Sequence, residues 1–483
     1  MKASRALLKD SRILSVGVWL GLGVLAGIFF AVYSNFAQDD AYITYRYARN
    51  LVSGLGFVYN RGEHVLGTTT PLYTLILAAA AYVTKLGVAK ISTVFCFAGL
   101  WFSAGMLFEI GKSQNKLFAL SIALVFVSNP FLRHFVGMES LFLIALLMLT
   151  VWAYGRGKRM PSAILSGLLV TTRYEMVFLM CLVYLGDFLT TRRLSLRYLA
   201  GGIPVAAWLV FAYLTFGSPI PLSVSAKLAA PRVSFLVGAA IHWYQFSREI
   251  ALVNVVLVFL FAGVFVSLAK RGTHREYALI LIWSIVYIVV AAIWAGSFPW
   301  YYAPLIPGFA ILTTVGMDYL TTFPAILQRL EHNPSRSRRL ARILLSCGVT
   351  LVVCLQFAFW IRDYAIYRGQ VFDHRYVPYR EVSKWLRTHA TKDQTIVTYE
   401  IGYIGYFTDM HIVDLAGLVT PALYPWIEEG REATLTHALR IYAPDFALVP
   451  SDNIGQIEIL TQDDRYALEK EFEGTQLLYR KVD

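Results

Sequence analysis

Charged residues are scarce in this chain. Asp, Glu, Lys and Arg together make up 15% of its 483 residues, whereas typical soluble domains carry about 25%. Hydrophobic residues make up 57%, and the mean hydropathy is +0.55. This deficit of charge favours a lipid environment.

Cysteine is rare as well, and the four cysteines all lie within apolar runs. They are Cys96, Cys181, Cys347 and Cys354. None falls in the polar C-terminal part, so the sequence has neither a disulfide framework nor the paired spacing of a zinc site. We interpret them as packing residues of the apolar core.

Acidic residues are few before residue 361 and frequent after it. Residues 1–361 hold 30 Lys and Arg against 12 Asp and Glu, whereas residues 362–483 hold 13 against 19. The change predicts two domains, a membrane domain over 1–361 and a polar domain over 362–483. The pI of about 9.4 does not indicate nucleic-acid binding, because most of the basic excess lies in short loops between apolar runs.

Long apolar runs dominate residues 1–361. A run of about 20 apolar residues crosses a bilayer as a helix, because lipid offers backbone groups no other hydrogen-bond partner. We expect about eleven transmembrane helices and one segment that does not span, the weakest lying within 70–135 and at 161–172. The candidate segments are 13–35, 70–88, 91–110, 117–135, 139–155, 161–172, 174–190, 198–216, 250–269, 277–296, 302–320 and 342–361.

Basic clusters predict the orientation, because Lys and Arg gather in cytoplasmic loops. They place the N-terminus in the cytoplasm and the loop 36–69, the loop 217–249 and the C-terminal domain outside, in a multi-pass protein of the plasma (inner) membrane. The clusters lie at Lys2, Arg5, Lys9, Arg12, at Arg156, Lys158, Arg159, at Arg192, Arg193, Arg197, at Lys270, Arg271, Arg275 and at Arg336, Arg338, Arg339, Arg342.

The C-terminal domain reads as a small α/β fold. YREVSKWLRTHA has the spacing of a helix, and TIVTY, HIVDLAGL, DFALVP and LLYRKV have the apolar content of strands. Asp414 in VDLAGL reads as a structural residue at a strand end, with acceptor binding as the alternative.

The first external loop carries the strongest chemical signal. Asp39 and Asp40 follow the first apolar run directly, and two adjacent carboxylates repel each other unless a cation or a hydroxyl group lies between them. Arg46 and Arg49 follow at helical spacing, with tyrosines between them. Acids, arginines and Gly-rich turns at a membrane face suit chemistry with a phosphate leaving group. The alternative for both arginines is simple interfacial anchoring.

The string DDAYITYRYARNLVSGLGFVYNRGEHVLGTTTPL resembles the first external loop of GT-C glycosyltransferases, membrane enzymes that use polyprenyl-phosphate sugar donors. It is most similar to the branch that adds terminal β-arabinofuranose to mycobacterial arabinan, and more distantly to protein O-mannosyltransferases and lipid A aminoarabinose transferases. SNPFLRHFVGMESLF, TTRYE and IGYIGYFTDMHIVDLAGLVTP are similar to further stretches of that branch, although Tyr174 stands where the family usually has proline.

The resemblance implies a catalytic role for the aspartates. One of them would deprotonate the acceptor hydroxyl in a single inverting displacement. We favour Asp39 as the base, with Asp40 orienting it or sharing a divalent cation. The donor phosphate would be bound by Arg46, Arg49, Arg173 and Lys227, and the substrates by Glu63, His64, Thr68, Glu139, Glu175, Tyr301 and Tyr302.

Structural alternatives accompany several of these roles. Arg173 could serve in an ion pair with Glu139 or Glu175, and Tyr301 and Tyr302 could belong to an interfacial aromatic belt.

The function expected is transfer of a sugar, with arabinofuranose as the first candidate, to a glycan, lipid or protein acceptor. The alternatives are a transporter or flippase of a lipid-linked saccharide, which would usually show internal repeats, and a non-catalytic scaffold.

Overall fold

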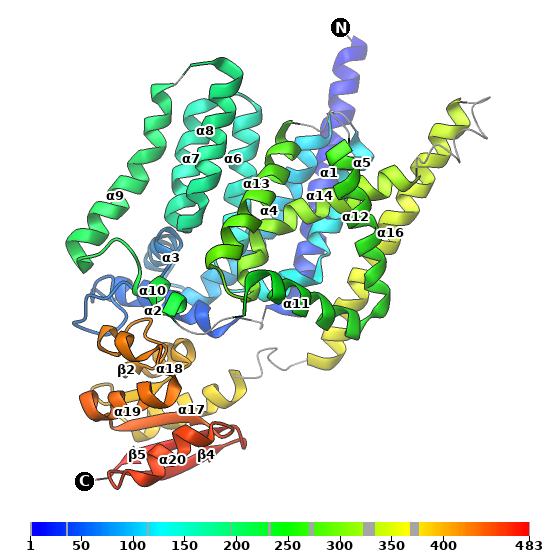
Figure 1. Cartoon of the computed structure of the whole chain (residues 1–483). Coiled ribbons are helices and arrows are strands. Elements are labelled where there is room, and N and C mark those ends of the chain that lie inside the picture. The colour runs from blue at the N-terminus through cyan, green and yellow to red at the C-terminus, as the bar shows by residue number, and fades with distance from the viewer. Residues whose placement is uncertain are drawn as a thin grey trace.

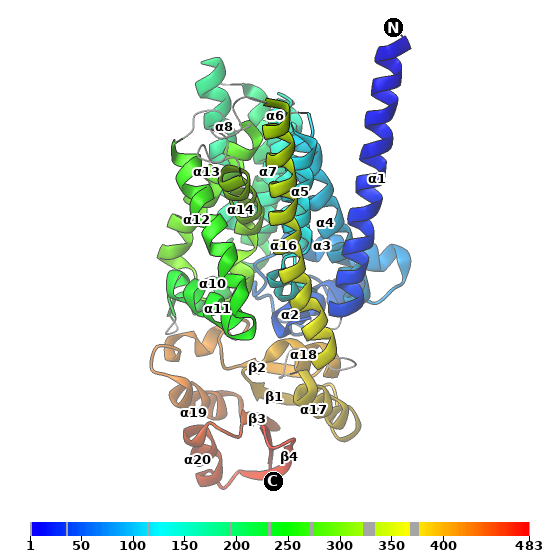
Figure 2. The same ribbon diagram turned by 90° about the vertical axis from the view of Figure 1, so that its right-hand side faces the viewer.

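The computed structural model describes residues 2–34, 37–113, 115–193, 195–229, 233–269, 275–321, 334–367 and 376–482. A bundle of long helices makes up most of the molecule, and a small α/β domain lies at one end of it (Figure 1). The N-terminal helix begins at the opposite end of the bundle (Figure 2). Lys270 and Arg271, part of one expected basic cluster, fall outside the described residues.

The apolar runs form the helices of the bundle, as the sequence predicts. These helices are α1 Lys2–Tyr33, α4 Val88–Gly111, α5 Lys116–Val127, α6 Ser140–Gly155, α7 Arg159–Thr172, α8 Val177–Thr191, α9 Leu199–Phe216, α12 Asn254–Ala269, α13 Arg275–Trp294, α14 Ile306–Thr321 and α16 Pro334–Tyr367. Among the described residues, seven helical segments are long and apolar enough to cross a membrane, and four apolar helices are shorter. The expected total of about eleven crossings therefore requires shorter helices to cross as well.

Helix α3, Pro71–Thr84, differs in direction from α6, α7 and α8 (Figure 1). Figure 1 shows it almost end-on near α2, whereas α6, α7 and α8 run along the bundle side by side. The short α7 thus follows the direction of its neighbours. The candidate segment 70–88 is the one that lies across them.

Short elements cover the end of the bundle that faces the α/β domain. They are α2 Asp39–Val52, the 3₁₀ turns η1 Pro130–Phe135, η2 Tyr174–Met176, η4 Ala251–Val253 and η5 Pro299–Leu305, and the helices α10 Leu222–Ala229 and α11 Phe235–Glu249. A further turn, η3 Leu196–Tyr198, precedes α9. The polar residues that the sequence singles out in the membrane domain lie on or next to these short elements and the loop after α2.

The C-terminal domain contains a five-stranded sheet in the order β2-β1-β3-β5-β4. The strands are β1 Thr395–Thr398, β2 His411–Asp414, β3 Phe446–Pro450, β4 Tyr466–Phe472 and β5 Gln476–Lys481. Strands β1, β2 and β3 are parallel, and β5 runs antiparallel to both β3 and β4. The predicted mixed α/β fold and its four predicted strands are confirmed, while β4 adds a strand at the edge.

Helices complete this domain: α17 Tyr376–His389, α18 Ile401–Thr408, α19 Arg431–Tyr442 and α20 Ile454–Gln462, with the turn η6 Pro421–Trp426. Helix α17 confirms the helix predicted from YREVSKWLRTHA. Helix α16 continues to Tyr367, beyond the domain boundary expected at residue 361.

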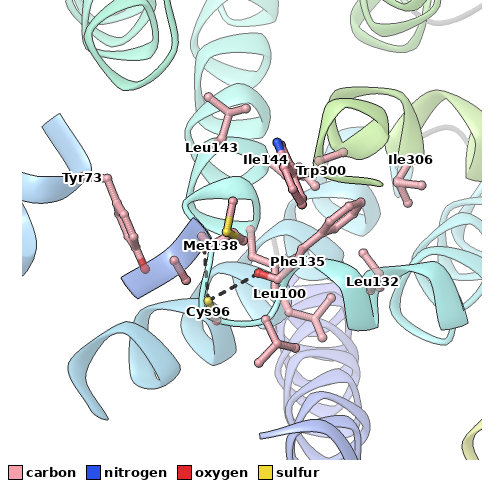
Figure 3. Close-up of a cluster of buried hydrophobic side chains, with 14 of the residues drawn as sticks. Tyr73, Cys96, Leu100, Leu132, Phe135, Met138, Leu143, Ile144, Trp300 and Ile306 are labelled. Atoms are coloured by element: carbon pink, nitrogen blue, oxygen red, sulfur yellow. Dashed lines mark hydrogen bonds between the residues drawn. The ribbon is translucent and has the colours of Figure 1, made fainter. Parts of the chain in front are cut away.

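A buried apolar cluster supports the end of the bundle that carries the short elements. Leu132 and Phe135 of η1 pack there with Leu143 of α6 and with Trp300 of η5 (Figure 3). The Cys96 thiol of α4 points to the carbonyl oxygens of Phe135 and Met138, at 3.9 and 3.4 Å. This packing holds the start of α6 and the turn η5 in place.

Candidate active site

An apolar cavity of about 880 Å³ lies between α9, α10, α13 and η5. Its walls are mainly aliphatic and aromatic, and they include Ile220 and Ile293, whose side chains are exposed on the surface of the bundle. Three charged side chains, Arg173, Glu175 and Lys227, also line it. The cavity therefore combines a long apolar space with a charged patch.

A second cavity, also of about 880 Å³, lies between the membrane domain and the C-terminal domain. One wall comes from α2 and α10, through Asp40 and Lys227, and the other comes from the C-terminal domain. Many of its lining side chains are polar. Residues of the C-terminal domain that line it include Tyr399, Glu400, Arg431, Ser451, Asp452 and Gln476.

A small polar pocket of about 50 Å³ adjoins both cavities. Lys227 lines all three spaces, Asp40 lines the pocket and the second cavity, and Arg173 lines the pocket and the apolar cavity. The shared residues mean that the three spaces meet here. We call this place the junction, defined by Asp40, Arg173 and Lys227.

Asp40 and Lys227 face each other at the junction. The Lys227 ammonium lies 3.6 Å from Asp40 Oδ1 and 5.3 Å from the centre of the Phe298 ring. Burial lowers the pKa of Lys227, but Tyr301 and the Asp40 carboxylate raise it, and the net pKa lies above its ordinary value. Lys227 is therefore a fixed positive charge beside a half-buried carboxylate.

Arg173 is buried, and its guanidinium is surrounded by acceptors. Nε lies 2.6 Å from Glu175 Oε1, and Nη1 lies 3.6 Å from Glu139 Oε1 and 3.2 Å from the carbonyl oxygen of Trp300. The guanidinium also lies over the Tyr301 ring, at 5.2 Å from its centre. The expected ion pair with the two glutamates is thus present, and the same arginine lines the junction.

The side chains of the two tyrosines of η5 point in different directions. Tyr301 lines the apolar cavity and the small pocket. Tyr302 instead points away, because its hydroxyl donates to the carbonyl oxygen of Phe235 at 2.7 Å and its ring stacks on the Phe235 ring. The substrate contact predicted for Tyr302 is therefore not supported by its position.

The Asp39 carboxylate is hydrogen-bonded to the C-terminal domain. Its side chain is 2% exposed, and its two carboxylate oxygens accept hydrogen bonds from the backbone N–H groups of Gly402 and Tyr403, at 2.8 and 2.7 Å. These N–H groups open α18, where a carboxylate also meets the positive end of the helix dipole. Asp39 lines the second cavity only, whereas Asp40 lines that cavity and the small pocket and therefore faces the junction. The choice of Asp39 as the base stays a prediction.

Arg46 and Arg49 also join the two domains instead of lining a substrate cavity. Arg46 is buried, donates to the Met410 carbonyl oxygen at 2.7 Å and lies over the Tyr59 ring. Arg49 pairs with Asp409 of the C-terminal domain. Neither arginine lines the junction or either of the large cavities. Both contact the C-terminal domain, and their contact with the donor phosphate stays a prediction.

The other predicted site residues of the first loop are Glu63, His64 and Thr68, and of these only Thr68 lines one of the three spaces. Thr68 is buried and lines the small pocket, next to Thr70. Glu63 accepts from Asn60 at 2.9 Å and lies 3.4 Å from His411 of the C-terminal domain, and His64 is exposed. Glu63 and His64 lie outside the walls of the three spaces, and their predicted contact with the donor sugar is not supported.

Ser223 is a site residue that the sequence analysis did not identify. It lies one helical turn before Lys227 on α10, is 3% exposed, and lines both the apolar cavity and the small pocket. Its hydroxyl has no hydrogen-bond partner among the described residues. The spacing of four residues from Lys227 was the available signal, since it places both side chains on one helix face.

Asp414 has the structural role expected for it. Its carboxylate accepts from the backbone N–H groups of Ala416, Leu418 and Val419, at 2.8, 2.6 and 3.1 Å. Burial raises the pKa of its carboxyl group to about 7, against the effect of these N–H groups. The turn that it holds carries Leu418, which lines the second cavity and the small pocket.

A divalent cation shared by Asp39 and Asp40 does not fit this geometry. The Asp39 oxygens accept backbone N–H groups, and Asp40 lies beside the Lys227 ammonium. No group of three or more His, Cys, Asp or Glu side chains able to hold a metal ion occurs among the described residues.

One family model matches the C-terminal part of the chain. The family model "Domain of unknown function (DUF8728)" matches residues 365–481, which make up the C-terminal domain. The terminal beta-(1->2)-arabinofuranosyltransferase of Mycobacterium tuberculosis (strain ATCC 25618 / H37Rv) is 28% identical over 243 residues. That match covers 44% of this chain and 39% of the mycobacterial protein.

Two crystal structures of ArnT from Cupriavidus metallidurans are similar over almost the whole chain. The structure bound to undecaprenyl phosphate aligns with a TM-score of 0.63 and 13% identity over 98% of both chains. The apo structure aligns with a TM-score of 0.64 and 14% identity over 99% of this chain and 98% of that chain. At this identity the likeness establishes the fold. The chain is a polytopic helical membrane protein with an ArnT-like fold.

Proposed function

We propose that this chain is an inverting glycosyltransferase that moves a sugar from a polyprenyl-phosphate donor to an acceptor on the outer face of the plasma membrane. The observation that carries the proposal is the junction, where an apolar cavity, a small polar pocket and an interdomain cavity meet at Asp40, Arg173 and Lys227. The match to an arabinofuranosyltransferase makes arabinofuranose the first candidate sugar.

The apolar cavity suits the lipid end of the donor. A polyprenyl chain needs an apolar space open to the bilayer, and exposed Ile220 and Ile293 lie on the walls of this one. The phosphate would lie at the charged patch, within reach of Lys227 and Arg173, since guanidinium and ammonium groups stabilise phosphate charge. The ArnT crystal structure bound to undecaprenyl phosphate supports a lipid phosphate as the ligand of this fold.

The small pocket suits the donor sugar, because it lies between the charged patch and the second cavity. Its polar lining includes Thr68, Ser223 and Glu139. In this arrangement the anomeric carbon would lie between the phosphate and Asp40. A nucleophile arriving from the second cavity would approach on the face opposite the phosphate, which is the geometry of inversion.

Asp40 then acts as the general base. It takes the proton of the acceptor hydroxyl as that oxygen bonds to the anomeric carbon, and the bond from this carbon to the phosphate oxygen breaks. The electron pair of the broken bond leaves with polyprenyl phosphate, whose charge Lys227 and Arg173 stabilise.

The distribution of basic residues supports the proposed orientation. Arg156 and Lys158 lie between α6 and α7, Arg159 is the first residue of α7, and Arg192 and Arg193 follow α8. This is the end of the bundle away from the C-terminal domain (Figure 1). Because such clusters mark the cytoplasmic side, the junction and the C-terminal domain would be extracytoplasmic.

A reconstituted system tests the proposal. The purified chain in liposomes would be offered a panel of polyprenyl-phosphate sugars with candidate glycan, lipid and protein acceptors, and release of polyprenyl phosphate would be followed. We expect turnover with one donor and a product linkage of inverted configuration by NMR. Retention of configuration would contradict the mechanism. Movement of an intact lipid-linked saccharide across the bilayer without release of the lipid phosphate would instead support a flippase.

A further inference from the structure

The C-terminal wall of the second cavity contains a buried glutamine amide. Gln476 on β5 is 8% exposed and lines the cavity. Its Oε1 has no hydrogen-bond partner among the described residues. Buried polar atoms are almost always satisfied by protein, water or ligand. The Gln476 amide oxygen is therefore available to a polar ligand or to water in the cavity.

An aromatic ring and a guanidinium group lie on the same wall. The Arg431 guanidinium lies over the half-buried Tyr399 ring, at 4.9 Å from its centre. A tyrosine ring offers an apolar face for the C–H groups of a sugar, and its hydroxyl offers a polar edge. The planar guanidinium of Arg431 supplies several donors for sugar hydroxyls. Together with Gln476, these groups are of the kind that binds a saccharide.

The charged side chains that line the second cavity indicate what charge the bound saccharide can carry. Six charged side chains line it: Asp39, Asp40, Glu400 and Asp452 are acidic, and Lys227 and Arg431 are basic. An excess of negative charge disfavours a phosphorylated or carboxylated acceptor, because like charges repel at short range. Its polar wall also contrasts with the apolar cavity that suits a lipid chain. A neutral, polyhydroxylated acceptor fits best.

We propose that the C-terminal domain is the acceptor-recognition domain, and that Tyr399, Arg431 and Gln476 bind a neutral saccharide whose terminal hydroxyl reaches Asp40. This inference rests on the proposed function and names its acceptor class. It also gives a role to the segment that matches a domain of unknown function. The donor side of the junction, in contrast, comes from the membrane domain except for Leu418 of the C-terminal domain, which lines the small pocket.

The test uses the full chain in liposomes with the Arg431→Gln and Gln476→Leu variants. The probes are a short neutral arabinofuranose oligosaccharide and the same oligosaccharide carrying a terminal phosphate. We expect each variant to raise the KM for the neutral acceptor by about tenfold, the loss of one or two hydrogen bonds. The KM for the donor and the kcat should stay within about twofold. Arg440→Gln, on the same helix α19 but outside the cavity wall, is the matched control and should leave all three constants unchanged.

Calorimetric titration of the neutral oligosaccharide into the full chain separates this inference from the proposed function. If the donor turns over but both variants keep the wild-type acceptor KM and affinity, the assignment of Arg431 and Gln476 to acceptor binding is wrong. The proposal of a glycosyltransferase then still stands. If no donor turns over, binding of the oligosaccharide that is lost in Arg431→Gln still supports a saccharide site. No binding, or tighter binding of the phosphorylated probe, would overturn the inference.

Discussion

Asp39 and Gly402 are in direct contact across the boundary between the two domains. The Gly402 N–H donates to Asp39 Oδ2 at 2.8 Å, and a Cβ atom on Gly402 would lie 1.9 Å from the Asp39 carbonyl oxygen. The absence of a side chain at Gly402 thus lets α18 reach α2 at the residue that precedes Asp40. The C-terminal domain is thereby fixed to the helix that carries the proposed base.

Substitution of Gly402 by alanine should weaken this domain contact. The added methyl group would overlap backbone atoms of α2, so we expect a loss of about 1–3 kcal/mol of stability and faster proteolytic release of the C-terminal domain. Limited proteolysis and thermal unfolding in detergent measure both effects. Gly202→Ala, where a Cβ meets nothing within 4 Å, should behave as wild type. Equal protease resistance in the two variants would contradict the docking described here.

Removing the Arg49 side chain should affect docking without affecting donor binding. Arg49→Ala breaks the ion pair with Asp409, which lies outside the junction and both large cavities. We expect a loss of about 1 kcal/mol, since the pair is half-exposed, and an unchanged KM for the donor. If the KM for the donor rises by tenfold in a protein of unchanged stability, the original assignment of Arg49 to the donor phosphate would be correct.

Ser223→Ala should reduce donor affinity without destabilising the fold. The hydroxyl has no partner among the described residues, so its removal costs no internal hydrogen bond and leaves the thermal midpoint equal or slightly higher. We expect the KM for the donor to rise by about threefold to tenfold, which corresponds to one hydrogen bond to the sugar or phosphate. Ser247→Ala, on α11 away from the junction, is the control. Unchanged donor kinetics in Ser223→Ala would show that the Ser223 hydroxyl does not contact the donor.

The charge of Lys227 should persist at alkaline pH. Its pKa lies above the ordinary value of 10.5, so the ammonium stays protonated below that pH and its deprotonation cannot reduce the rate between pH 7 and 9.5. Lys227→Gln should lower kcat by about 100-fold at every pH in this range, because it removes one charge from the leaving phosphate. A decline of the wild-type rate near pH 8 that is absent in Lys227→Gln would show that Lys227 titrates within the range.

Local patterns in the sequence were sufficient for much of the fold. The apolar runs of the bundle and the strands β1, β2, β3 and β5 have the composition that burial demands. Strand β4 was missed because five of its seven residues are exposed and three of these, Glu469, Lys470 and Glu471, are charged, so it lacks the alternation of a half-buried strand. Helix α18 was missed because glycines and aromatic residues dominate it.

The roles of individual charged residues depended on contacts that no local pattern contains. Arg46 and Arg49 have the spacing of a phosphate site, but their partners Met410 and Asp409 come more than 350 residues later. Asp39 and Asp40 are neighbours in sequence, yet successive residues of a helix point in different directions. One therefore faces α18 and the other faces Lys227, and only the tertiary structure distinguishes them.

The most direct test of this account compares Asp40→Asn with wild type in the reconstituted transfer assay. The substitution keeps size and polarity but removes the base, so we expect kcat to fall by about 100-fold or more, with an unchanged thermal midpoint and donor KM. Asp463→Asn, which affects a carboxylate paired with Arg465 on the C-terminal domain, should retain full activity. A folded Asp40→Asn variant with wild-type kcat would contradict the assignment of Asp40 as the base and the placement of the reaction at the junction.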